Sequence, residues 1–269
     1  MSQGYIQEIF SSFQGEGSSI EGSCYGLRQI FLRFSGCPLA LGIHGTKGCI
    51  WCDSPKAKGK NPKYYLVETK AGSRKFEKFE NPMTVNDVVK SLIGLTTNDL
   101  HSISLTGGEP LYQPQFAEEI ISALKERDYR IFLETAYCDD LKYLERISQM
   151  IDFACVDVKD NSSGASLEWE KLVNLEINMC EILKNAGVKV FAKTVITKSS
   201  KYADFEKIAE LCGDIEIPLA IQIVTPPKKS DILPPTREQI NDISEIAAKY
   251  LAPEKIGLSV QMHKCIDIL

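Results

Sequence analysis

The sequence lacks any long apolar segment. No stretch approaches the roughly 18–20 uninterrupted apolar residues that a membrane span requires, so no transmembrane helix is expected. The first residues, Met1 to Tyr5, contain no basic region followed by an apolar run, so no secretory signal peptide is expected either. These absences predict a cytoplasmic protein that does not act at a membrane.

An excess of basic residues is also missing. The formal net charge is −5, and nothing in that balance predicts a surface that binds nucleic acid. The chain contains neither a repeat of fixed period nor a low-complexity linker. With 269 residues, of which 43% are hydrophobic, it is expected to form a single domain of barrel size over residues 1–269.

The cysteines do not form an even set for disulfide pairing, because the chain has nine of them. The odd number, and their scatter through apolar segments, predict free thiols in a reducing compartment. Most are expected to be small buried core residues. These are Cys24, Cys138, Cys155, Cys180, Cys212 and Cys265.

The remaining cysteines, Cys37, Cys49 and Cys52, lie in one glycine-rich, loop-like segment. The last two have the Cys-x-x-Cys spacing that is typical of a metal site, and thiolates select zinc or iron–sulfur clusters. Two interpretations stay open at this point. His44 completes a four-ligand zinc site, in a zinc-binding module without enzymatic activity. Alternatively, the thiols hold a four-iron cluster whose fourth iron is open to a small molecule.

Strand and helix signals alternate along most of the chain. Repeated strand–helix units predict an α/β protein with a mainly parallel sheet covered by helices. About seven strands favour a partial (β/α) barrel, and a doubly wound open sheet is the alternative. Strands are predicted at 29–34, 102–105, 130–133, 153–158, 188–196, 219–224 and 256–262, and helices at 84–95, 114–127, 140–150, 168–185, 202–211 and 236–251.

Residues 55–83 differ from the rest in composition, because Lys and Arg outnumber Glu there. Aromatic segments at 64–67 and 76–79 flank the turn-like residues 70–73, a pattern that indicates a hairpin. We expect an inserted, basic, hairpin-like segment that faces solvent. The alternative is a basic flap that covers an anionic partner.

Polar residues follow the predicted strands one after another. In parallel barrels the functional groups lie at the carboxyl ends of the strands, so this series predicts one active-site rim. Thr106-Gly107-Gly108-Glu109-Pro110 lacks the Gly-Lys-Ser/Thr ending of a P-loop, and it suits the ammonium group of an amino acid-like cofactor. The strand-end residues are Arg33, Thr106 to Glu109, Glu134, Asp157 to Lys159, Lys193, Gln222, Thr225 and Gln261 to Lys264.

The cysteine and glycine motifs together resemble the radical S-adenosylmethionine (SAM) superfamily, with a longer first gap than the commonest Cys-x3-Cys-x2-Cys form. A narrower resemblance covers nearly the whole chain and is to the 7-carboxy-7-deazaguanine synthase family. Its motifs occur here in the family's order. They are Phe13-Gln14-Gly15-Glu16-Gly17, Arg33-Phe34-Ser35-Gly36-Cys37, Cys52-Asp53-Ser54, Thr106-Gly107-Gly108-Glu109-Pro110, Glu134-Thr135 and Gln261-Met262-His263-Lys264.

This resemblance implies a lyase that contracts 6-carboxy-5,6,7,8-tetrahydropterin to 7-carboxy-7-deazaguanine with loss of ammonia, a step toward queuosine and related 7-deazapurines. It implies a [4Fe–4S] cluster, S-adenosylmethionine and Mg²⁺ as cofactors. It also implies an external electron donor of the flavodoxin or ferredoxin type, and a homodimer. Another radical SAM enzyme, such as a glycyl-radical activase, is the main alternative.

The resemblance also implies roles for individual residues. Cys37, Cys49 and Cys52 would bind three irons. Ser54, where the family usually has threonine, would bind Mg²⁺. Arg33 would form a forked bond with the substrate carboxylate. The cofactor would contact Trp51, Cys52, Asp53, Gly107, Gly108, Glu109, Glu134, Asp157, Val158 and Lys159. The substrate would contact Phe13, Gln14, Gly15, Glu16, Arg33, Thr106, Gln222, Thr225, His263 and Leu269.

One departure from the family pattern follows Glu134-Thr135, where Asn-Gly is usual and this chain has Ala136-Tyr137. Tyr137 would either stack near the adenosine of the cofactor or narrow the pocket. No residue is assigned as a catalytic acid or base.

Overall fold

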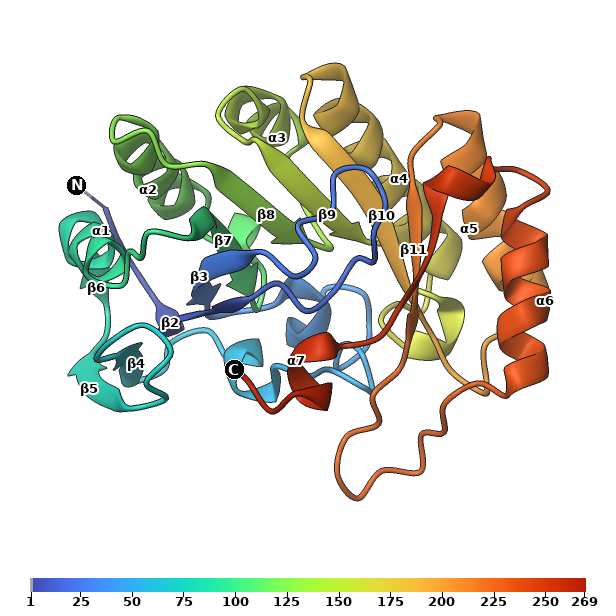
Figure 1. Ribbon diagram of the computed structural model, residues 1–269, viewed down its shortest axis with the longest axis horizontal. Helices are drawn as coiled ribbons and strands as arrows, with labels where there is room; N and C mark the ends of the chain where they lie inside the picture. Colours follow the sequence, from blue (N-terminus) through green and yellow to red (C-terminus); the bar gives the residue numbers. More distant parts are fainter. Residues whose placement is uncertain (1) are drawn as a thin grey trace.

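The computed structural model describes residues 2–269 and contains a curved sheet with helices around its outer face (Figure 1). The sheet has ten strands in the order β12-β11-β10-β9-β8-β7-β3-β2-β4-β5. Its two edge strands, β12 and β5, do not pair with each other in the described part of the chain, so the barrel is open. The helices follow one face of the sheet, which confirms the partial (β/α) barrel and excludes a doubly wound sheet.

The strands and helices of the parallel part alternate as the sequence pattern predicts, and most bounds agree within three residues. The parallel strands are β3 (Arg28–Phe34), β7 (Leu100–Gly107), β8 (Ile131–Thr135), β9 (Phe153–Asp157), β10 (Lys189–Ile196), β11 (Leu219–Ile223) and β12 (Ile256–Ser259). The outer helices are α1 (Val85–Gly94), α2 (Pro114–Lys125), α3 (Leu141–Ser148), α4 (Trp169–Asn185), α5 (Tyr202–Asp214) and α6 (Arg237–Ala247).

Helix starts have local causes that can be read in the sequence. Thr84 is the N-cap of α1, where its hydroxyl accepts a hydrogen bond from the Asp87 backbone N–H at 3.2 Å. Thr236 and Gln239 form a capping box at the start of α6, with bonds of 3.0 and 3.1 Å. These caps satisfy backbone groups that the first helical turn leaves without partners.

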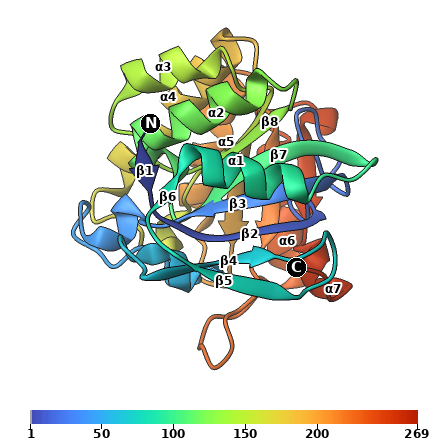
Figure 2. The same cartoon turned by 90° about the vertical axis from the view of Figure 1, so that its left-hand side faces the viewer.

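The remaining strands extend the sheet beyond β3 (Figure 2). β2 (Ile6–Phe13) pairs antiparallel with β3 and parallel with β4 (Tyr64–Glu68), which forms a hairpin with β5 (Phe76–Glu80). The basic segment therefore continues the main sheet. A separate two-stranded sheet joins β1 (Gln3–Gly4) to β6 (Met83–Thr84).

Apolar residues pack on both faces of the sheet, and the cavity lies next to the inner cluster. The main core lies between the sheet and the outer helices. On the inner face, Phe132, Cys155 and Phe191 pack against Ile20 and Cys24 from the segment between β2 and β3. This packing fills part of the barrel interior, and an open space remains at the carboxyl ends of the strands.

The C-terminal segment differs from the expectation. The last strand was predicted to run to Met262, but β12 ends at Ser259. The Met262 backbone N–H donates to the Gly15 carbonyl at 2.9 Å, and the short helix α7 (Met262–Cys265) begins there. Cys265 is consequently exposed, and its assignment to the core was wrong. The predicted core cysteines that are buried are Cys24, Cys138, Cys155, Cys180 and Cys212.

All nine cysteines are free thiols in the described chain. Among residues 2–269, no helix combines the length and the apolar character that crossing a bilayer would take.

Candidate active site

The carboxyl ends of the parallel strands border one cavity of about 200 Å³. Its wall includes every residue predicted to hold the cluster, the magnesium ion, the cofactor or the substrate, except Val158. The side chain of Val158 is buried in the main core instead. The residues predicted at the carboxyl ends of the strands therefore line one cavity, as expected for a parallel barrel.

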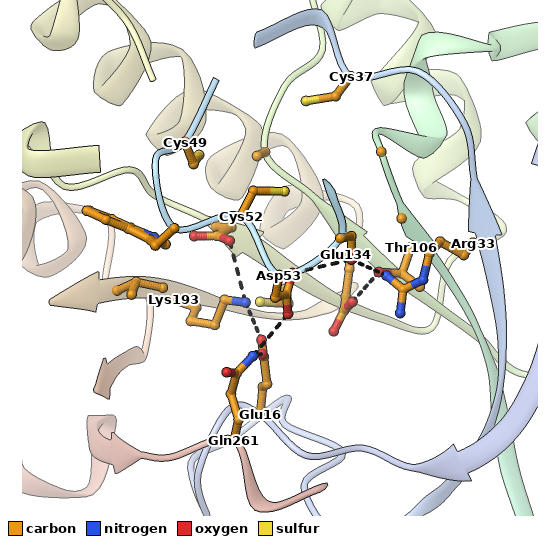
Figure 3. Close-up of a pocket in the computed structure, with 18 of the residues that line it drawn as sticks. Glu16, Arg33, Cys37, Cys49, Cys52, Asp53, Thr106, Glu134, Lys193 and Gln261 are labelled. Atoms are coloured by element: carbon orange, nitrogen blue, oxygen red, sulfur yellow. Dashed lines mark hydrogen bonds and ion pairs between the residues drawn. The ribbon is translucent and has the colours of Figure 1, made fainter. Parts of the chain in front are cut away.

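The three predicted cluster thiols lie on one side of this cavity (Figure 3). Cys37 follows β3 and precedes the short 3-10 helix η1 (Pro38–Leu41), and Cys49 and Cys52 come from the return of the same loop. Burial raises the pKa of all three thiols, that of Cys49 to about 11. Such thiols are protonated at neutral pH without metal, and they lose their protons when metal binds.

The donor set fits an iron–sulfur cluster better than zinc. No three His, Cys, Asp or Glu side chains within residues 2–269 are placed to hold one metal ion, whereas zinc needs its ligands around a single point. In a four-iron cluster each thiolate binds a different iron, so thiols can share a wall without converging on one point. His44 is not part of the cavity wall. Its ring packs edge-on against Tyr137 at 5.1 Å.

The two glycines after β7 hold this strand against the cysteine loop. The Gly108 backbone N–H donates to the Phe34 carbonyl at 3.0 Å, and that of Glu109 donates to the Gly36 carbonyl at 2.8 Å. A Cβ on Gly108 would lie 2.2 Å from the Gly36 oxygen, and Gly107 has a φ of 116°, a region that favours glycine. The glycines were expected to let a ligand approach the backbone, and the structure shows that they first let the chain approach itself.

Glu109 is fully engaged by its own chain. Its buried carboxylate accepts hydrogen bonds from the Thr135 hydroxyl at 2.8 Å and from the backbone N–H groups of Leu111, Ala136 and Tyr137 at 3.1, 2.9 and 3.1 Å. Burial raises the pKa of Glu109 to about 7, although these donors oppose the shift. The side chain therefore fixes residues 135–137 beside the cavity.

Tyr137 does not line the cavity. It packs with Leu39, Ala165 and Leu172 in a small apolar cluster behind the wall. It therefore neither stacks in the pocket nor narrows it directly. Tyr137, which follows β8, instead contacts both the cysteine loop, at Leu39 and His44, and the segment that follows β9, at Ala165.

A row of alternating charges crosses the cavity (Figure 3). Lys159 pairs with Asp157 at 2.7 Å, Asp157 lies 3.5 Å from Lys193, and Lys193 pairs with Glu16. The Gln261 side-chain amide continues the row by donating to Glu16 at 2.6 Å. Burial alone lowers the pKa of Lys193, but Asp157 and Glu16 raise it well above its ordinary value. Lys193 therefore joins residues predicted for the cofactor to residues predicted for the substrate.

A second polar chain forms one wall. The Gln14 side-chain amide donates to Glu134 at 3.0 Å and to Gln29 at 3.1 Å, and the Thr106 hydroxyl donates to Glu134 at 2.5 Å. The Gln29 amide in turn donates to the Ser102 hydroxyl at 2.9 Å. Burial raises the pKa of Glu134. Gln14 and Glu134, which were predicted to contact different ligands, are thus in direct contact.

Arg33 is partly paired but keeps a free edge. Its Nε lies 2.8 Å from a Glu8 carboxylate oxygen, and its Nη1 donates to the Ser54 hydroxyl at 2.6 Å. A guanidinium has five N–H donors, so the Nη2 edge is left for a ligand. Ser54 precedes the 3-10 helix η2 (Pro55–Lys58), but its hydroxyl makes no capping bond. That hydroxyl instead donates to an Asp53 carboxylate oxygen at 3.3 Å, and Arg33, Asp53 and Ser54 all line the cavity.

The C-terminal residues close the cavity opposite the thiols. The Gln261 amide also donates to Asp53 at 3.0 Å, and the Ser12 hydroxyl donates to the Leu269 carbonyl oxygen at 2.6 Å. His263 lines the same wall, and burial lowers its pKa although Glu16 and Asp53 oppose the shift. These contacts tie the end of the chain to β2 and to the cysteine loop.

The fold and the thiol-lined cavity define an enzyme of the radical SAM superfamily. Residues 34–212 match the family model for that superfamily. A radical SAM methyltransferase from Sphaerobacter thermophilus superposes with a TM-score of 0.60 over 87% of this chain and 66% of its own. The two sequences are 13% identical, so this likeness shows the fold alone.

Relatives with higher identity narrow the assignment. The 7-carboxy-7-deazaguanine synthase of Thermococcus kodakarensis is 36% identical over 98% of each chain. That of Methanocaldococcus jannaschii is 35% identical over 98% of this chain and 100% of its own. The chain therefore belongs to the 7-carboxy-7-deazaguanine synthase family. Its superfamily implies a [4Fe–4S] cluster and S-adenosylmethionine.

Proposed function

We propose that this enzyme is a lyase that converts 6-carboxy-5,6,7,8-tetrahydropterin to 7-carboxy-7-deazaguanine and ammonia, in the formation of queuosine-type 7-deazapurines. The observation that carries this proposal is the cavity itself. It combines three thiols, the free edge of Arg33, and the side chains of Gln14 and Glu16. A carboxypterin carries a carboxylate that suits a guanidinium, and an amino–lactam edge that suits amide and carboxylate groups.

The cofactor half of the cavity would be built from the cysteine loop and the ends of β7 to β9. Cys37, Cys49 and Cys52 would hold the cluster. When bound, the cluster and S-adenosylmethionine supply a 5′-deoxyadenosyl radical that removes hydrogen from the substrate. The backbone at Gly107 and Gly108 lines this half, and Glu109 stabilises residues 135–137 next to it. Asp157 and Lys159 add a charged pair there.

The substrate half of the cavity would bind both ends of the pterin. The Nη2 edge of Arg33 would bind the carboxylate, and Glu16, held by Lys193 and Gln261, would bind the amino–lactam edge. Ser54 would add a hydroxyl ligand for Mg²⁺, which retains waters and takes further oxygens from the substrate. The Arg33–Ser54 hydrogen bond would give way to these contacts, because Mg²⁺ and a guanidinium repel each other without a carboxylate between them.

We further propose that residues 1–269 form one catalytic domain and that two chains form a cytoplasmic homodimer. A flavodoxin- or ferredoxin-type protein would supply its electrons. Sedimentation velocity tests the homodimer directly, since each chain has a mass of 30.0 kDa. A single species of about twice that mass supports the dimer, and a monomer across the working concentration range contradicts it.

Product identification tests the reaction. The protein is purified and reconstituted with iron and sulfide without oxygen, then given S-adenosylmethionine, dithionite, Mg²⁺ and the carboxypterin. We expect 7-carboxy-7-deazaguanine and one equivalent of ammonia by mass spectrometry and enzymatic ammonia assay. Unchanged pterin beside 5′-deoxyadenosine would assign the enzyme to another radical SAM substrate. Zinc without sulfide in the purified protein would instead favour the zinc module.

A further inference from the structure

Helix α4 holds the backbone of Lys159 from behind the cavity wall. The Lys159 backbone N–H donates to Glu176 Oε2 at 2.9 Å, and the Trp169 indole N–H donates to the Lys159 carbonyl at 2.6 Å. Trp169 and Glu176 are seven residues apart, which is about two turns of α4, so their side chains leave the same face of the helix. Both backbone polar groups of Lys159 are therefore bonded by side chains of one helix.

The residue before Lys159 is fixed as well. The Val158 backbone N–H donates to the Lys193 carbonyl at 2.8 Å, and the Val158 side chain is buried in the main core. Lys159 follows and lines the cavity, whereas neither Trp169 nor Glu176 does. Any effect of these two side chains on a ligand therefore passes through the wall residue that they bond.

Glu176 is an acid on a buried face of α4. Its exposed fraction is 0%, and its Oε1 has no hydrogen-bond partner in the part of the chain that the structure describes. Burial raises the pKa of Glu176 well above its ordinary value, although the backbone N–H and the charge of Lys159 oppose the shift. An apolar side chain would occupy this position without that desolvation cost. The hydrogen bond to Lys159 is thus the contact that distinguishes glutamate here.

The ammonium of Lys159 has donors to spare. Among residues 2–269 its one ion pair is with Asp157, at 2.7 Å, and its side chain is 12% exposed. An ammonium has three N–H donors, so two are left for acceptor atoms of a ligand in the cavity. Burial raises the pKa of Cys37, Cys49 and Cys52, and the charge of Lys159 opposes that rise in each thiol. The ammonium therefore acts on the thiol-bearing side of the cavity.

We propose that Trp169 and Glu176 are positioning residues, which fix Lys159 so that its ammonium donates to acceptor oxygens of S-adenosylmethionine beside the cluster thiols. The inference rests on the proposed function, in which Lys159 contacts this cofactor. The two side chains transfer neither a proton nor an electron in this role. They act by preorganisation, because a donor whose backbone is already fixed loses less conformational freedom when the ligand binds.

Binding of S-adenosylmethionine without turnover tests this role. The reconstituted holoprotein is dialysed to equilibrium against radiolabelled S-adenosylmethionine, without oxygen, reductant or pterin. Glu176→Met removes the acceptor, and Trp169→Phe removes the indole donor while it keeps an aromatic ring. Lys159→Met measures the loss of affinity when the ammonium itself is absent.

Two controls separate positioning from general loss of structure. Glu176→Gln is the conservative variant, because its side-chain oxygen can still accept from the Lys159 N–H. Tyr143→Phe is the matched control. It removes a hydrogen bond of 2.7 Å from a buried aromatic side chain to the Pro114 carbonyl, on α3, and Tyr143 does not line the cavity.

We expect the Kd for S-adenosylmethionine to rise about tenfold in Glu176→Met and at least about threefold in Trp169→Phe. It should stay within about twofold of the wild-type value in Glu176→Gln and Tyr143→Phe. Lys159→Met/Glu176→Met should bind no more weakly than Lys159→Met alone, because Glu176 acts through Lys159. Hydrogen exchange of the Lys159 amide should be faster in Glu176→Met than in the wild type.

Three results would overturn the proposal. The first is a Kd in Glu176→Met equal to that of Tyr143→Phe. The second is a double variant in which the two single losses add. The third is an equal loss in Glu176→Gln and Glu176→Met, which would mean that the carboxyl group does not act as an acceptor for Lys159. If Glu176→Met does not fold, as judged by circular dichroism, Trp169→Phe and its double variant with Lys159→Met decide the same question.

Failure of the proposed function gives a different result. If the wild type binds S-adenosylmethionine but forms no product from the carboxypterin, the proposed reaction fails, and the Kd values of the variants still decide the role of α4. If Lys159→Met binds the cofactor as tightly as the wild type, Lys159 makes no contact with it, and the positioning role is overturned whatever the product.

Discussion

Replacing Lys193 by methionine tests the row of charges that joins the two halves of the cavity. The change keeps the length of the side chain but removes the ammonium that contacts Glu16 and Asp157. Breaking a buried ion pair by removing one partner costs about 3–5 kcal/mol. Here the side chains of Glu16 and Asp157 are 12% and 23% exposed, and each retains a second partner, in Gln261 and Lys159. We therefore expect a loss of about 2–3 kcal/mol.

The assay is urea unfolding of the apoprotein, followed by circular dichroism, for the wild type and the variant. In thermal unfolding the same loss corresponds to a fall in Tm of about 4–5 °C in a chain of this length. Lys189→Met, on the exposed end of the same strand, is the control and should change stability by less than about 0.5 kcal/mol. In the reconstituted enzyme, Lys193→Met should also raise the KM for the carboxypterin, because Glu16 loses a positioning contact.

A double-mutant cycle gives the result that would refute this reasoning. Glu16→Gln alone leaves the Lys193 ammonium with less compensation, so the two single variants should each lose stability. The double variant should lose less than their sum, by about 1.5–3 kcal/mol, the size of a charge-assisted hydrogen bond. A coupling energy below about 0.5 kcal/mol would mean that Lys193 and Glu16 do not act as a pair in solution.

Three further variants test single roles in the cavity. Arg33→Ala should weaken pterin binding about 10–100-fold, through the loss of a charge-assisted pair of about 1.5–3 kcal/mol; a KM like that of the exposed control Arg146→Ala would refute that contact. Ser54→Ala should abolish the stimulation of turnover by Mg²⁺, and an unchanged metal response would remove Ser54 as a ligand. Burial raises the pKa of Glu109 from 4.5 to about 7, so the folded state holds this proton more tightly than the unfolded state and the contribution of the group to stability decreases as pH rises through that range. Glu109→Gln cannot ionise, so its free energy of unfolding should rise by about 3 kcal/mol relative to that of the wild type as the pH increases from 4.5 to about 7. A difference that does not change with pH in urea unfolding would contradict this.

The parallel part of the fold could be predicted because its signals are local. Strands such as 153–158 are short apolar runs, and caps such as Thr84 precede amphipathic helices, so alternation follows from the sequence itself. The pairing of β2 with β4 could not be predicted in this way. It depends on a contact between segments far apart in the chain, which no local pattern encodes. The same is true of the end of β12, where a hydrogen bond to Gly15 redirects the chain.

The sequence predicted which residues line the candidate site better than it predicted the contacts that their side chains make. The carboxyl ends of parallel strands lie at the same edge of the sheet, so residues such as Arg33 and Asp157 were expected to line the same cavity. The hydrogen-bond partners of a side chain do not follow from its position at the end of a strand. Glu109 was predicted to contact the cofactor, and in the structure its carboxylate accepts hydrogen bonds from its own chain. Lys193 was placed on the predicted rim but was given no role, and its ion pairs with Glu16 and Asp157 could not be read from the sequence.

The central claim is that this cavity brings a carboxypterin to the radical formed by the cluster and S-adenosylmethionine. Its most direct test is hydrogen transfer from substrate that carries deuterium on its reduced ring carbons, in an oxygen-free reaction with the reconstituted enzyme. We predict deuterium in the 5′-deoxyadenosine, recovered together with 7-carboxy-7-deazaguanine. Unlabelled 5′-deoxyadenosine, with all of the pterin recovered unchanged, would contradict the claim.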